Sequence, residues 1–227
     1  MKILGLQKLS LVDWDGHITC TVFAGHCNFA CPFCHNSSLV SGEEDEIHES
    51  EVLEYLDKRK NMLDSVCVSG GEPTLYPDLP DFIKKIKNMG YKVKLDTNGT
   101  NLKMIKRLVE ENLIDYIAMD IKNSIEKYPL TAGRDTDCDT IIESIKYIKE
   151  CGIDYEFRTT LIDEFHKEED IIKMAQVLDG AKRYYLQKFV DSGSCIQSGL
   201  HAVSKDKAND FVKHLSNHVD AVYLRGY

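Results

Sequence analysis

Short apolar segments and amphipathic segments alternate along the whole chain, and this alternation limits the fold more than any other feature of the sequence. Runs rich in apolar and β-branched residues occur at HITCTVF, SVCVSG, YKVKLDT, DYIAMDI, DYEFRTTLI and RYYLQKF. Between these runs, apolar residues recur with helical spacing. Six strands that alternate with helices predict parallel pairing, because parallel neighbours need a crossover connection that a helix normally provides.

Residue spacing and end signals locate the helices between these strands. The first should begin near Ser50, a good N-cap, with an apolar face made by Val52, Leu53, Leu56 and Leu63. A second is predicted over residues 78–89, because Pro80 is tolerated in a first turn and Gly90 suits the position after a helix end. Four more are predicted near residues 102–109, 141–148, 171–178 and 211–215, before a last apolar run, VDAVYLRG.

The number of strand and helix units predicts the architecture. Six units fall short of the eight that close a full barrel. We therefore expect an α/β fold, a partial (β/α)6 TIM-type barrel, with a doubly wound open sheet as the alternative. The 227 residues contain no Pro/Gly/Ser-rich linker, so a single domain over residues 1–227 is predicted.

Composition and charge narrow the class of protein. Apolar residues make up 43% and charged residues 29%, which is ordinary for a soluble enzyme and unlike a disordered chain. The formal net charge of −9 argues against a nucleic-acid partner. The N-terminus lacks the apolar core of a signal peptide, and no window reaches the roughly 18 apolar residues of a membrane-spanning helix. We therefore expect a cytoplasmic protein without a membrane partner, in which clustered cysteines indicate metal or redox chemistry rather than disulfides.

Three of the eight cysteines lie close together in AGHCNFACPFCHN, where Cys27, Cys31 and Cys34 have the spacing C-x3-C-x2-C. A structural zinc ion usually takes four ligands, and His26 or His35 could complete that set. A [4Fe–4S] cluster also usually takes four cysteines, but the remaining ones form no second C-x2-C pair. Three thiolates on such a cluster would leave one iron open to bind another molecule.

Glycines and polar residues stand where the predicted strands end. The set comprises Gly70, Gly71 and Glu72, then Asp96, Thr97, Asn98 and Gly99, then Asp120 and Lys122, and finally Arg158 and Gln187. In a (β/α) barrel, the carboxyl ends of the strands face one mouth, where active sites are assembled. The pattern therefore predicts one site.

The cysteine motif, with the aromatic Phe33 before its last cysteine, is followed by SGGEP after the second predicted strand, and together they resemble the radical S-adenosylmethionine (SAM) superfamily. The resemblance implies that the three cysteines hold a [4Fe–4S] cluster whose open iron chelates SAM, and that Phe33 contacts this cofactor. It implies contact with the SAM amino group at Gly70, Gly71 and Glu72. Glycines allow close backbone approach, and a carboxylate suits a cationic ammonium group. Reductive cleavage of SAM would then give a 5′-deoxyadenosyl radical that abstracts hydrogen.

Further motifs narrow the resemblance. LDTNG followed by YIAMDIK resembles the glycyl-radical-enzyme activases, and the span from GLQKLSLVDWDG to KLDTNGTN is most similar to the activating proteins of anaerobic (class III) ribonucleoside-triphosphate reductase. This resemblance implies a large glycyl-radical enzyme, the anaerobic ribonucleotide reductase, as protein substrate. It also implies flavodoxin or ferredoxin as the reductant.

The same resemblance implies roles for the later strand ends. It predicts a monovalent cation, which oxygen ligands suit, at Asp96, Thr97, Ala118 and Asp120. Contact with the cofactor is implied for Asp96, Asn98 and Arg158. Gln187 stands where formate-lyase activases carry a histidine, so it is predicted to make a polar contact in place of that histidine, and the difference disfavours a formate-lyase activase.

Two other functions stay open beside the activase. One is radical chemistry on another glycyl-radical enzyme, of the formate-lyase type, or on a small molecule. The other is an iron–sulfur electron-transfer or sensor protein, which Gly70, Gly71 and Glu72 disfavour because an electron carrier needs four cluster ligands and no aminoacyl pocket.

Single residues also have simpler interpretations. Glu72 could cap the following segment, and Asp96 and Asn98 could belong to an ordinary turn. Asp120 with Lys122, and also Arg158, could be ion-pair partners at strand ends. Cys195 could be a buried free thiol.

Overall fold

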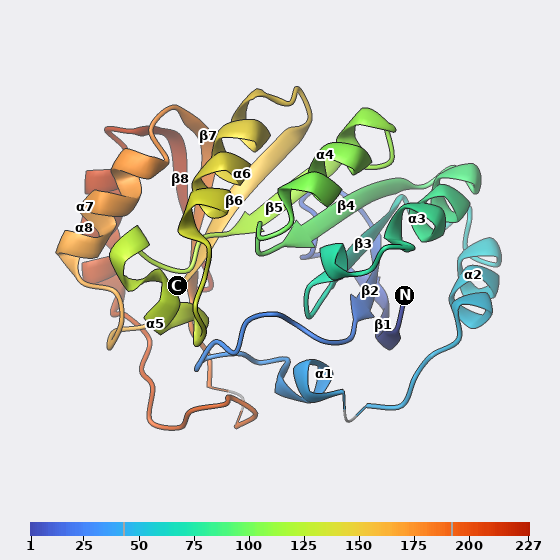
Figure 1. Ribbon diagram of the computed structural model, residues 1–227, viewed down its shortest axis with the longest axis horizontal. Coiled ribbons are helices and arrows are strands. Elements are labelled where there is room, and N and C mark those ends of the chain that lie inside the picture. Colours follow the sequence, from blue (N-terminus) through green and yellow to red (C-terminus); the bar gives the residue numbers. More distant parts are fainter. Residues whose placement is uncertain (43, 192) are drawn as a thin grey trace. The chain divides into compact units, whose positions relative to one another are not determined.

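The computed structural model describes residues 1–42, 44–191 and 193–227, and its strands form one open sheet. The strands follow one another in chain order across this sheet (Figure 1). They are β1 Ile3–Ser10, β2 Thr19–Ala24, β3 Ser65–Gly70, β4 Lys92–Thr97, β5 Tyr116–Asp120, β6 Asp154–Leu161, β7 Ala181–Lys188 and β8 Val219–Arg225. The mostly parallel, unclosed sheet confirms the predicted α/β class and open architecture.

The six predicted strands correspond to β2 through β7, and two strands were not among them. β1 pairs antiparallel with β2, and its sequence ILGLQKLS lacks a continuous apolar run because Gly5, Gln7 and Lys8 interrupt it. β8 occupies the last apolar run and pairs in parallel with β7. The prediction of six strands was therefore too low, although the order of the units was right.

Contacts between Cα atoms divide the chain into two compact units. Unit 1 comprises Met1–Asn28, Ser38–Thr97 and Asn101–Ala118. Unit 2 comprises Phe29–Ser37, Asn98–Thr100 and Met119–Tyr227. The single domain over residues 1–227 stays a prediction.

The helices and 3-10 turns agree with most of the predicted positions. They are α1 Ser37–Ser41, α2 Glu49–Asp57, η1 Pro73–Leu75, α3 Leu79–Asn88, α4 Leu102–Glu110, η2 Ile125–Lys127, α5 Tyr128–Ala132, α6 Cys138–Glu150, α7 Glu168–Val177 and α8 Lys205–Leu215. The N-cap of α2 is His48 rather than Ser50, and Leu63 lies beyond the end of this helix. α1, η1, η2 and α5 were not predicted, because five-residue and three-residue helices are too short to show a periodic pattern.

In unit 1, β2, β3 and β4 pair in parallel, and α3 packs against β4 and α2. The chain turns from α3 into β4 within a few residues, as the ribbon shows (Figure 1). Because α3 has apolar residues on one face only, it buries that face against the sheet and leaves most of its charged residues exposed. The buried residues are Leu79, Pro80, Phe82, Ile83 and Ile86.

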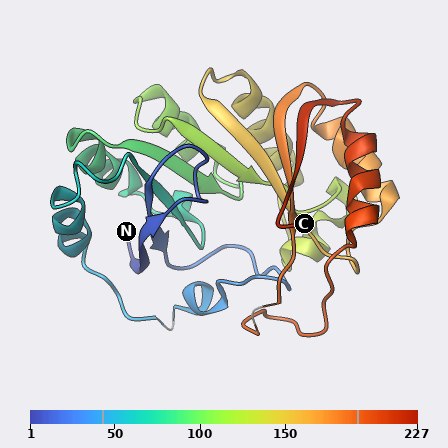
Figure 2. The same ribbon diagram turned by 180° about the vertical axis from the view of Figure 1, so that it is seen from behind.

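In unit 2, β6, β7 and β8 pair in parallel, so both connections must cross over. α7 and α8 supply them, and these two helices pack on each other. α8 also packs on β8, as seen from behind in Figure 2. Tyr155, Phe157 and Tyr184 are fully buried in the core of this unit.

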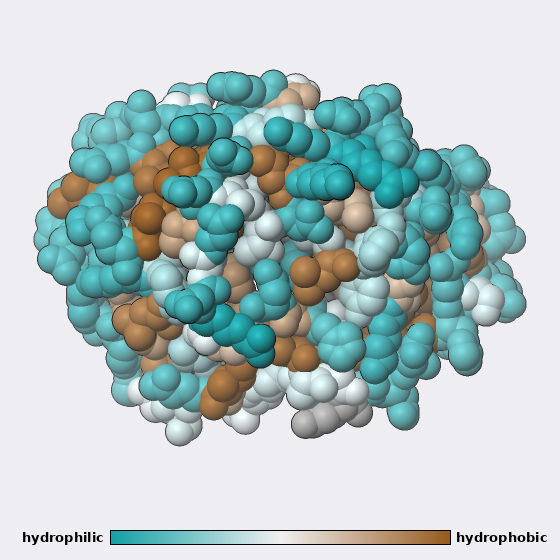
Figure 3. Space-filling model, in the orientation of Figure 1, coloured by the Kyte–Doolittle hydropathy of each residue, from teal (hydrophilic) through white to brown (hydrophobic). Residues whose placement is uncertain are grey.

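Hydrophilic side chains cover most of the face drawn in Figure 3, and hydrophobic side chains appear there in small groups. Such scattered apolar groups are normal on a protein surface. Within residues 1–42, 44–191 and 193–227, no helix combines the length and the apolar character that crossing a membrane requires.

Candidate functional site

The three clustered cysteines lie in the loop that leads from β2 to α1. None of the three forms a disulfide; Cys31 is only 7% exposed, and the other two are half-buried. The boundary between the units falls inside this loop, so Cys27 belongs to unit 1, and Cys31 and Cys34 belong to unit 2. The Cys34 N–H donates to the Cys31 carbonyl at 3.0 Å, so the last two cysteines share one backbone turn.

Two later segments of unit 2 hold this cysteine loop through its backbone. The N–H of Ala30 donates to the carbonyl of Ala132 at 2.9 Å, at the end of α5. Gly133 follows with φ +70°, and a Cβ there would lie 2.1 Å from the Ala30 oxygen, so only glycine fits. The N–H of Gln197 donates to the carbonyl of Pro32 at 2.9 Å. The loop between the cysteines is therefore fixed by α5 and by the segment after β7.

Phe33 is buried in unit 2, where its ring packs against that of Phe165 with 6.5 Å between the centroids. This contact gives Phe33 a structural role in the cysteine loop. Its predicted contact with a cofactor stays a prediction.

In unit 1, the end of β3 lies directly against the start of the cysteine loop. Gly71 N–H donates to the Ala24 carbonyl, and Glu72 N–H donates to the His26 carbonyl, each at 2.8 Å. A Cβ on Gly71 would lie 1.8 Å from the His26 oxygen, and Gly70 has φ +114°. The glycines of SGGEP are thus required by the approach of protein backbone, which the sequence interpretation had assigned to a ligand.

The side chain of Glu72 is fully buried and accepts several hydrogen bonds. Its Oε1 accepts from the N–H of Thr74 at 3.1 Å, from the hydroxyl of Thr74 at 2.5 Å and from the hydroxyl of Thr97 at 2.8 Å. Glu72 is the N-cap of η1, which confirms the simpler interpretation from the sequence. Its contact with the SAM amino group stays a prediction.

Asp96 near the end of β4 contacts a buried lysine that the sequence did not indicate. Lys94 is 2% exposed, and its Nζ lies 3.3 Å from Asp96 Oδ1. The same ammonium donates to the carbonyl of Asp13, and the hydroxyl of Ser69 donates to Asp96 Oδ2 at 3.0 Å. In the strand sequence, Lys94 stands between the apolar residues Val93 and Leu95, which is the pattern of a position that points to solvent. The sequence therefore gave no indication that Lys94 is buried.

Asn98 and Gly99, in unit 2, form a turn. Asn98 Oδ1 accepts from the N–H of Thr100 at 3.0 Å and from its hydroxyl at 2.7 Å, as in an Asx turn. Gly99 has φ +79°, and a Cβ there would lie 2.1 Å from the terminal carbon of Met119. For Asn98 the structure confirms ordinary turn chemistry, and its contact with a cofactor stays a prediction.

A charged cluster in unit 2 surrounds the end of β5. Arg158 Nε donates to Asp120 Oδ1 at 2.8 Å, and Lys122 Nζ donates to Asp120 Oδ2 at 3.1 Å. Burial raises the pKa of Asp120, but the two cations outweigh it and hold this pKa well below its usual range. The predicted ion pairs are therefore confirmed, while the contact of Arg158 with SAM stays a prediction.

Lys122 also acts on one of the clustered cysteines. Burial raises the pKa of the Cys31 thiol, and the positive charge of Lys122 works against that rise. A thiol must lose its proton to bind a metal, so a nearby ammonium group favours the metal-binding form.

The four predicted cation ligands divide between the units, with Asp96, Thr97 and Ala118 in unit 1 and Asp120 in unit 2. Each of the two carboxylates contacts at least one cationic side chain. Among the residues that the structure describes, no group of three or more His, Cys, Asp and Glu side chains could hold a metal ion. The cation site stays a prediction.

Ser194, Cys195 and Gln197 contact the cysteine loop in unit 2. Cys195 Sγ lies 3.8 Å from Nδ1 of His35, and the hydroxyl of Ser194 donates to the His35 carbonyl at 3.1 Å. Cys195 is half-buried, not buried as the simpler interpretation had it. Gln187 lies in β7 opposite Thr160 of β6 and Arg225 of β8, and its predicted polar contact stays a prediction.

The model of the radical SAM superfamily matches residues 21–178 of this chain. A protein of Methanocaldococcus jannaschii, named as a candidate glycyl-radical enzyme activating enzyme, is 32% identical over 196 residues. The match covers 83% of this chain and 81% of that protein.

Solved structures share the fold at lower identity. A domain of pyruvate-formate lyase-activating enzyme from Bacteroides vulgatus matches 70% of this chain and 98% of its own, with a TM-score of 0.57 and 17% identity. Streptococcus suis SuiB bound to S-adenosylmethionine matches 89% of this chain and 49% of its own, with a TM-score of 0.69 and 17% identity. These likenesses confirm the partial barrel.

Proposed function

Because the chain belongs to the radical SAM superfamily, we propose that it is a glycyl-radical enzyme activating enzyme. It would cleave SAM reductively at a [4Fe–4S] cluster and abstract a hydrogen atom from a glycine of an anaerobic ribonucleotide reductase. The observation that carries this proposal is the loop with three cysteines in C-x3-C-x2-C spacing, none of which forms a disulfide.

The side-chain chemistry of this loop suits a [4Fe–4S] cluster. Cysteine thiolates are the usual protein ligands of iron–sulfur clusters, and Cys27, Cys31 and Cys34 would hold it. The charge of Lys122 favours the thiolate of Cys31. When bound, the cluster and SAM supply the electron and the 5′-deoxyadenosyl radical that this chemistry needs.

The chain's own residues would place and hold these groups. The backbone hydrogen bonds of Gly71 and Glu72 join the end of β3 to Ala24 and His26, so the SGGEP segment and the residues just before Cys27 are positioned together within unit 1. The buried carboxylate of Glu72 would attract the cationic amino group of SAM. The ion pairs of Asp120 fix the end of β5, and a rigid strand end is a precise support for a binding site.

The partner and the setting are further parts of the proposal. The name of the M. jannaschii relative supports a glycyl-radical enzyme as substrate, and the motif resemblance supports a ribonucleotide reductase. Flavodoxin or ferredoxin would supply the electron, in the cytoplasm. A monovalent cation at Asp96, Thr97, Ala118 and Asp120 is tested by comparing SAM binding in potassium chloride, sodium chloride and choline chloride.

The deciding experiment uses anoxic, reconstituted and chemically reduced protein with SAM and an anaerobic ribonucleotide reductase from the same source. Electron paramagnetic resonance and 5′-deoxyadenosine release are recorded together. A glycyl-radical signal that needs both SAM and the reductase, and that disappears when the target glycine is replaced by alanine, supports the activase. A glycyl-radical signal that appears only with a formate-lyase-type enzyme would identify that enzyme class, rather than the reductase, as the partner. Deoxyadenosine without any protein radical would favour a small-molecule substrate, and no SAM cleavage would favour an electron-transfer protein.

A further inference from the structure

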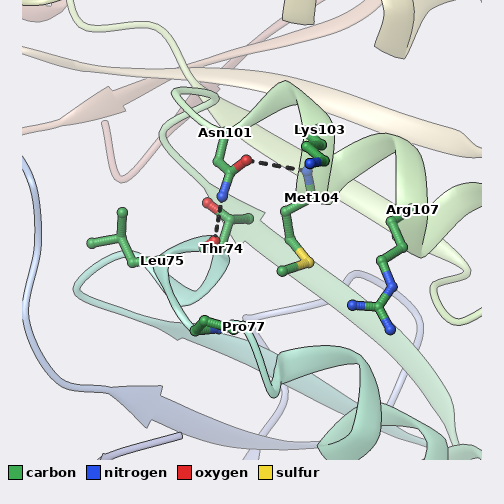
Figure 4. A pocket seen from close by; sticks show the side chains of 7 residues that line it. All are labelled: Thr74, Leu75, Pro77, Asn101, Lys103, Met104 and Arg107. Carbon is green, nitrogen blue, oxygen red and sulfur yellow. Dashed lines mark hydrogen bonds between the residues drawn. The ribbon is translucent and has the colours of Figure 1, made fainter.

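One side chain at the start of α4 connects this helix to the turn that carries Glu72. Asn101 is the N-cap of α4, and its Oδ1 accepts from the N–H of Met104 at 3.1 Å. The other end of the same amide, Nδ2, donates to the carbonyl of Thr74 at 2.6 Å (Figure 4). An amide can accept and donate at once, whereas an ionised aspartate at the N-cap can only accept.

Thr74, which accepts the hydrogen bond from Asn101, is itself hydrogen-bonded to Glu72. Both residues are fully buried, and Thr74 donates to Glu72 Oε1 through its N–H and through its hydroxyl. Asn101, Thr74 and Glu72 thus form one chain of hydrogen bonds within unit 1. Its far end is a buried carboxylate, whose direction is set by the groups that donate to it.

The space beside this chain is open. Thr74 and Asn101 line a hollow of about 280 Å³ between η1 and the first turns of α4 (Figure 4). The other lining residues are Leu75, Pro77, Lys103, Met104 and Arg107. The hollow lies between the turn and the helix, and the hydrogen bond from Asn101 Nδ2 to the Thr74 carbonyl links the two beside it.

We propose that Asn101 is a positioning residue, which holds the turn after β3 through Thr74 so that Glu72 faces the amino group of SAM. This inference rests on the proposed function, because it assumes that SAM binds at Glu72. It predicts that loss of the Nδ2 donor weakens SAM binding even when α4 keeps its cap.

Asn101→Asp separates the two roles of the side chain. An aspartate keeps the oxygen that accepts from Met104, and its negative charge suits a helix N-terminus. It has no donor for the Thr74 carbonyl and places a carboxylate oxygen against it. Asp137→Ala is the matched control, because it removes the N-cap of α6, where Asp137 Oδ1 accepts from Thr140 N–H at 3.2 Å, without touching η1.

The experiment measures SAM affinity by anoxic equilibrium dialysis on the full-length, cluster-loaded protein, and amide exchange at Thr74 and Met104 by nuclear magnetic resonance. We expect Asn101→Asp to raise the Kd for SAM about fivefold, the effect of one lost hydrogen bond. The Thr74 amide should exchange faster while Met104 stays protected, and Asp137→Ala should change none of these. Equal Kd values for wild type and Asn101→Asp would overturn the inference, as would unchanged exchange at Thr74. If the wild-type protein binds no SAM, the proposed function fails, and the exchange data still show whether Asn101 holds the turn.

Discussion

Thr97 Oγ1 donates a hydrogen bond of 2.8 Å to Oε1 of Glu72, joining two buried residues that are 25 positions apart in the chain. This bond connects the end of β4 to the turn after β3. Replacing Thr97 with valine keeps the shape of the side chain but removes the donor. We expect Thr97→Val to lower the free energy of unfolding by about 1.5–3 kcal/mol, the usual contribution of a hydrogen bond to a charged group. Urea unfolding at pH 7 measures it. Thr97→Ser keeps the donor, so its free energy of unfolding should fall clearly less than that of Thr97→Val. Equal decreases in the two variants would show that the hydroxyl does not contribute.

Gly71 should tolerate no side chain. A Cβ there would lie 1.8 Å from the His26 oxygen, and two backbone segments that are hydrogen-bonded to each other cannot move apart without cost. We expect Gly71→Ala to lower the free energy of unfolding by about 3 kcal/mol or more, at the upper end of overpacking effects. Gly16→Ala is the control, because Gly16 has φ +80° with open space around it. Its free energy of unfolding should fall by only about 1–2 kcal/mol, the cost of the left-handed backbone conformation. Similar losses for the two variants would contradict the close contact at Gly71.

Removal of any one clustered cysteine should abolish cluster loading. Cys27→Ala, Cys31→Ala and Cys34→Ala each leave two thiolates, which cannot hold a [4Fe–4S] cluster with one open iron. The iron and sulfide content after anoxic reconstitution measures the loss, and 5′-deoxyadenosine release should disappear with it. Cys138→Ala, at the start of α6, should load normally. Full iron content in Cys27→Ala would show that Cys27 is not a ligand of the cluster.

Protonation of His166 should destabilise the protein in mild acid. Its Nδ1 accepts from the Ile162 N–H at 3.0 Å, and its Nε2 lies 2.9 Å from the Lys122 carbonyl, so the neutral ring satisfies both partners. Burial lowers its pKa below the ordinary value of 6.5. The unfolded chain therefore takes up the proton first. The stability that the neutral ring provides is complete above pH 6.5 and is lost as the pH falls toward the lower pKa of the folded state.

Urea unfolding between pH 8 and pH 5, at about half-unit steps, checks this prediction. The slope due to one proton is at most about 1.4 kcal/mol per pH unit. His166→Gln does not titrate, so its stability should fall less steeply than that of the wild type below pH 6.5. Parallel curves would mean that His166 is not the group responsible.

Local patterns predicted the elements well where one periodicity continued over several turns. The apolar spacing of α3, with Asp78 before it and Gly90 after it, gave bounds within one residue of those observed. The same logic was wrong at Ser50, because α2 begins earlier, after His48, which makes no side-chain cap. β1 was missed because an antiparallel end strand with a glycine and polar residues shows neither a continuous apolar run nor a clean alternation.

The strand-end residues were found from the sequence, but their partners were not. Glu72 was recognised by its motif, whereas its bond to Thr97 depends on the pairing of β3 with β4, which no local pattern contains. The same holds for Asn101, because its bond to Thr74 joins residues 27 positions apart that no local pattern connects. The sequence therefore indicated candidate site residues, and the fold was needed to show which groups they contact.

The two backbone hydrogen bonds that hold the cysteine loop, from Ala30 to Ala132 and from Gln197 to Pro32, determine when the loop can become ordered during protein synthesis. The loop lies near the N-terminus, but its partners, Ala132 and Gln197, are made much later. Domains generally fold as units during translation, so the loop stays unrestrained on the ribosome until these residues emerge. Under the proposed function, cluster loading would then belong to the last stage of biogenesis. Stalled nascent chains should accordingly show fast alkylation of the loop cysteines when they end before residue 132 and slow alkylation once residue 197 has left the exit tunnel.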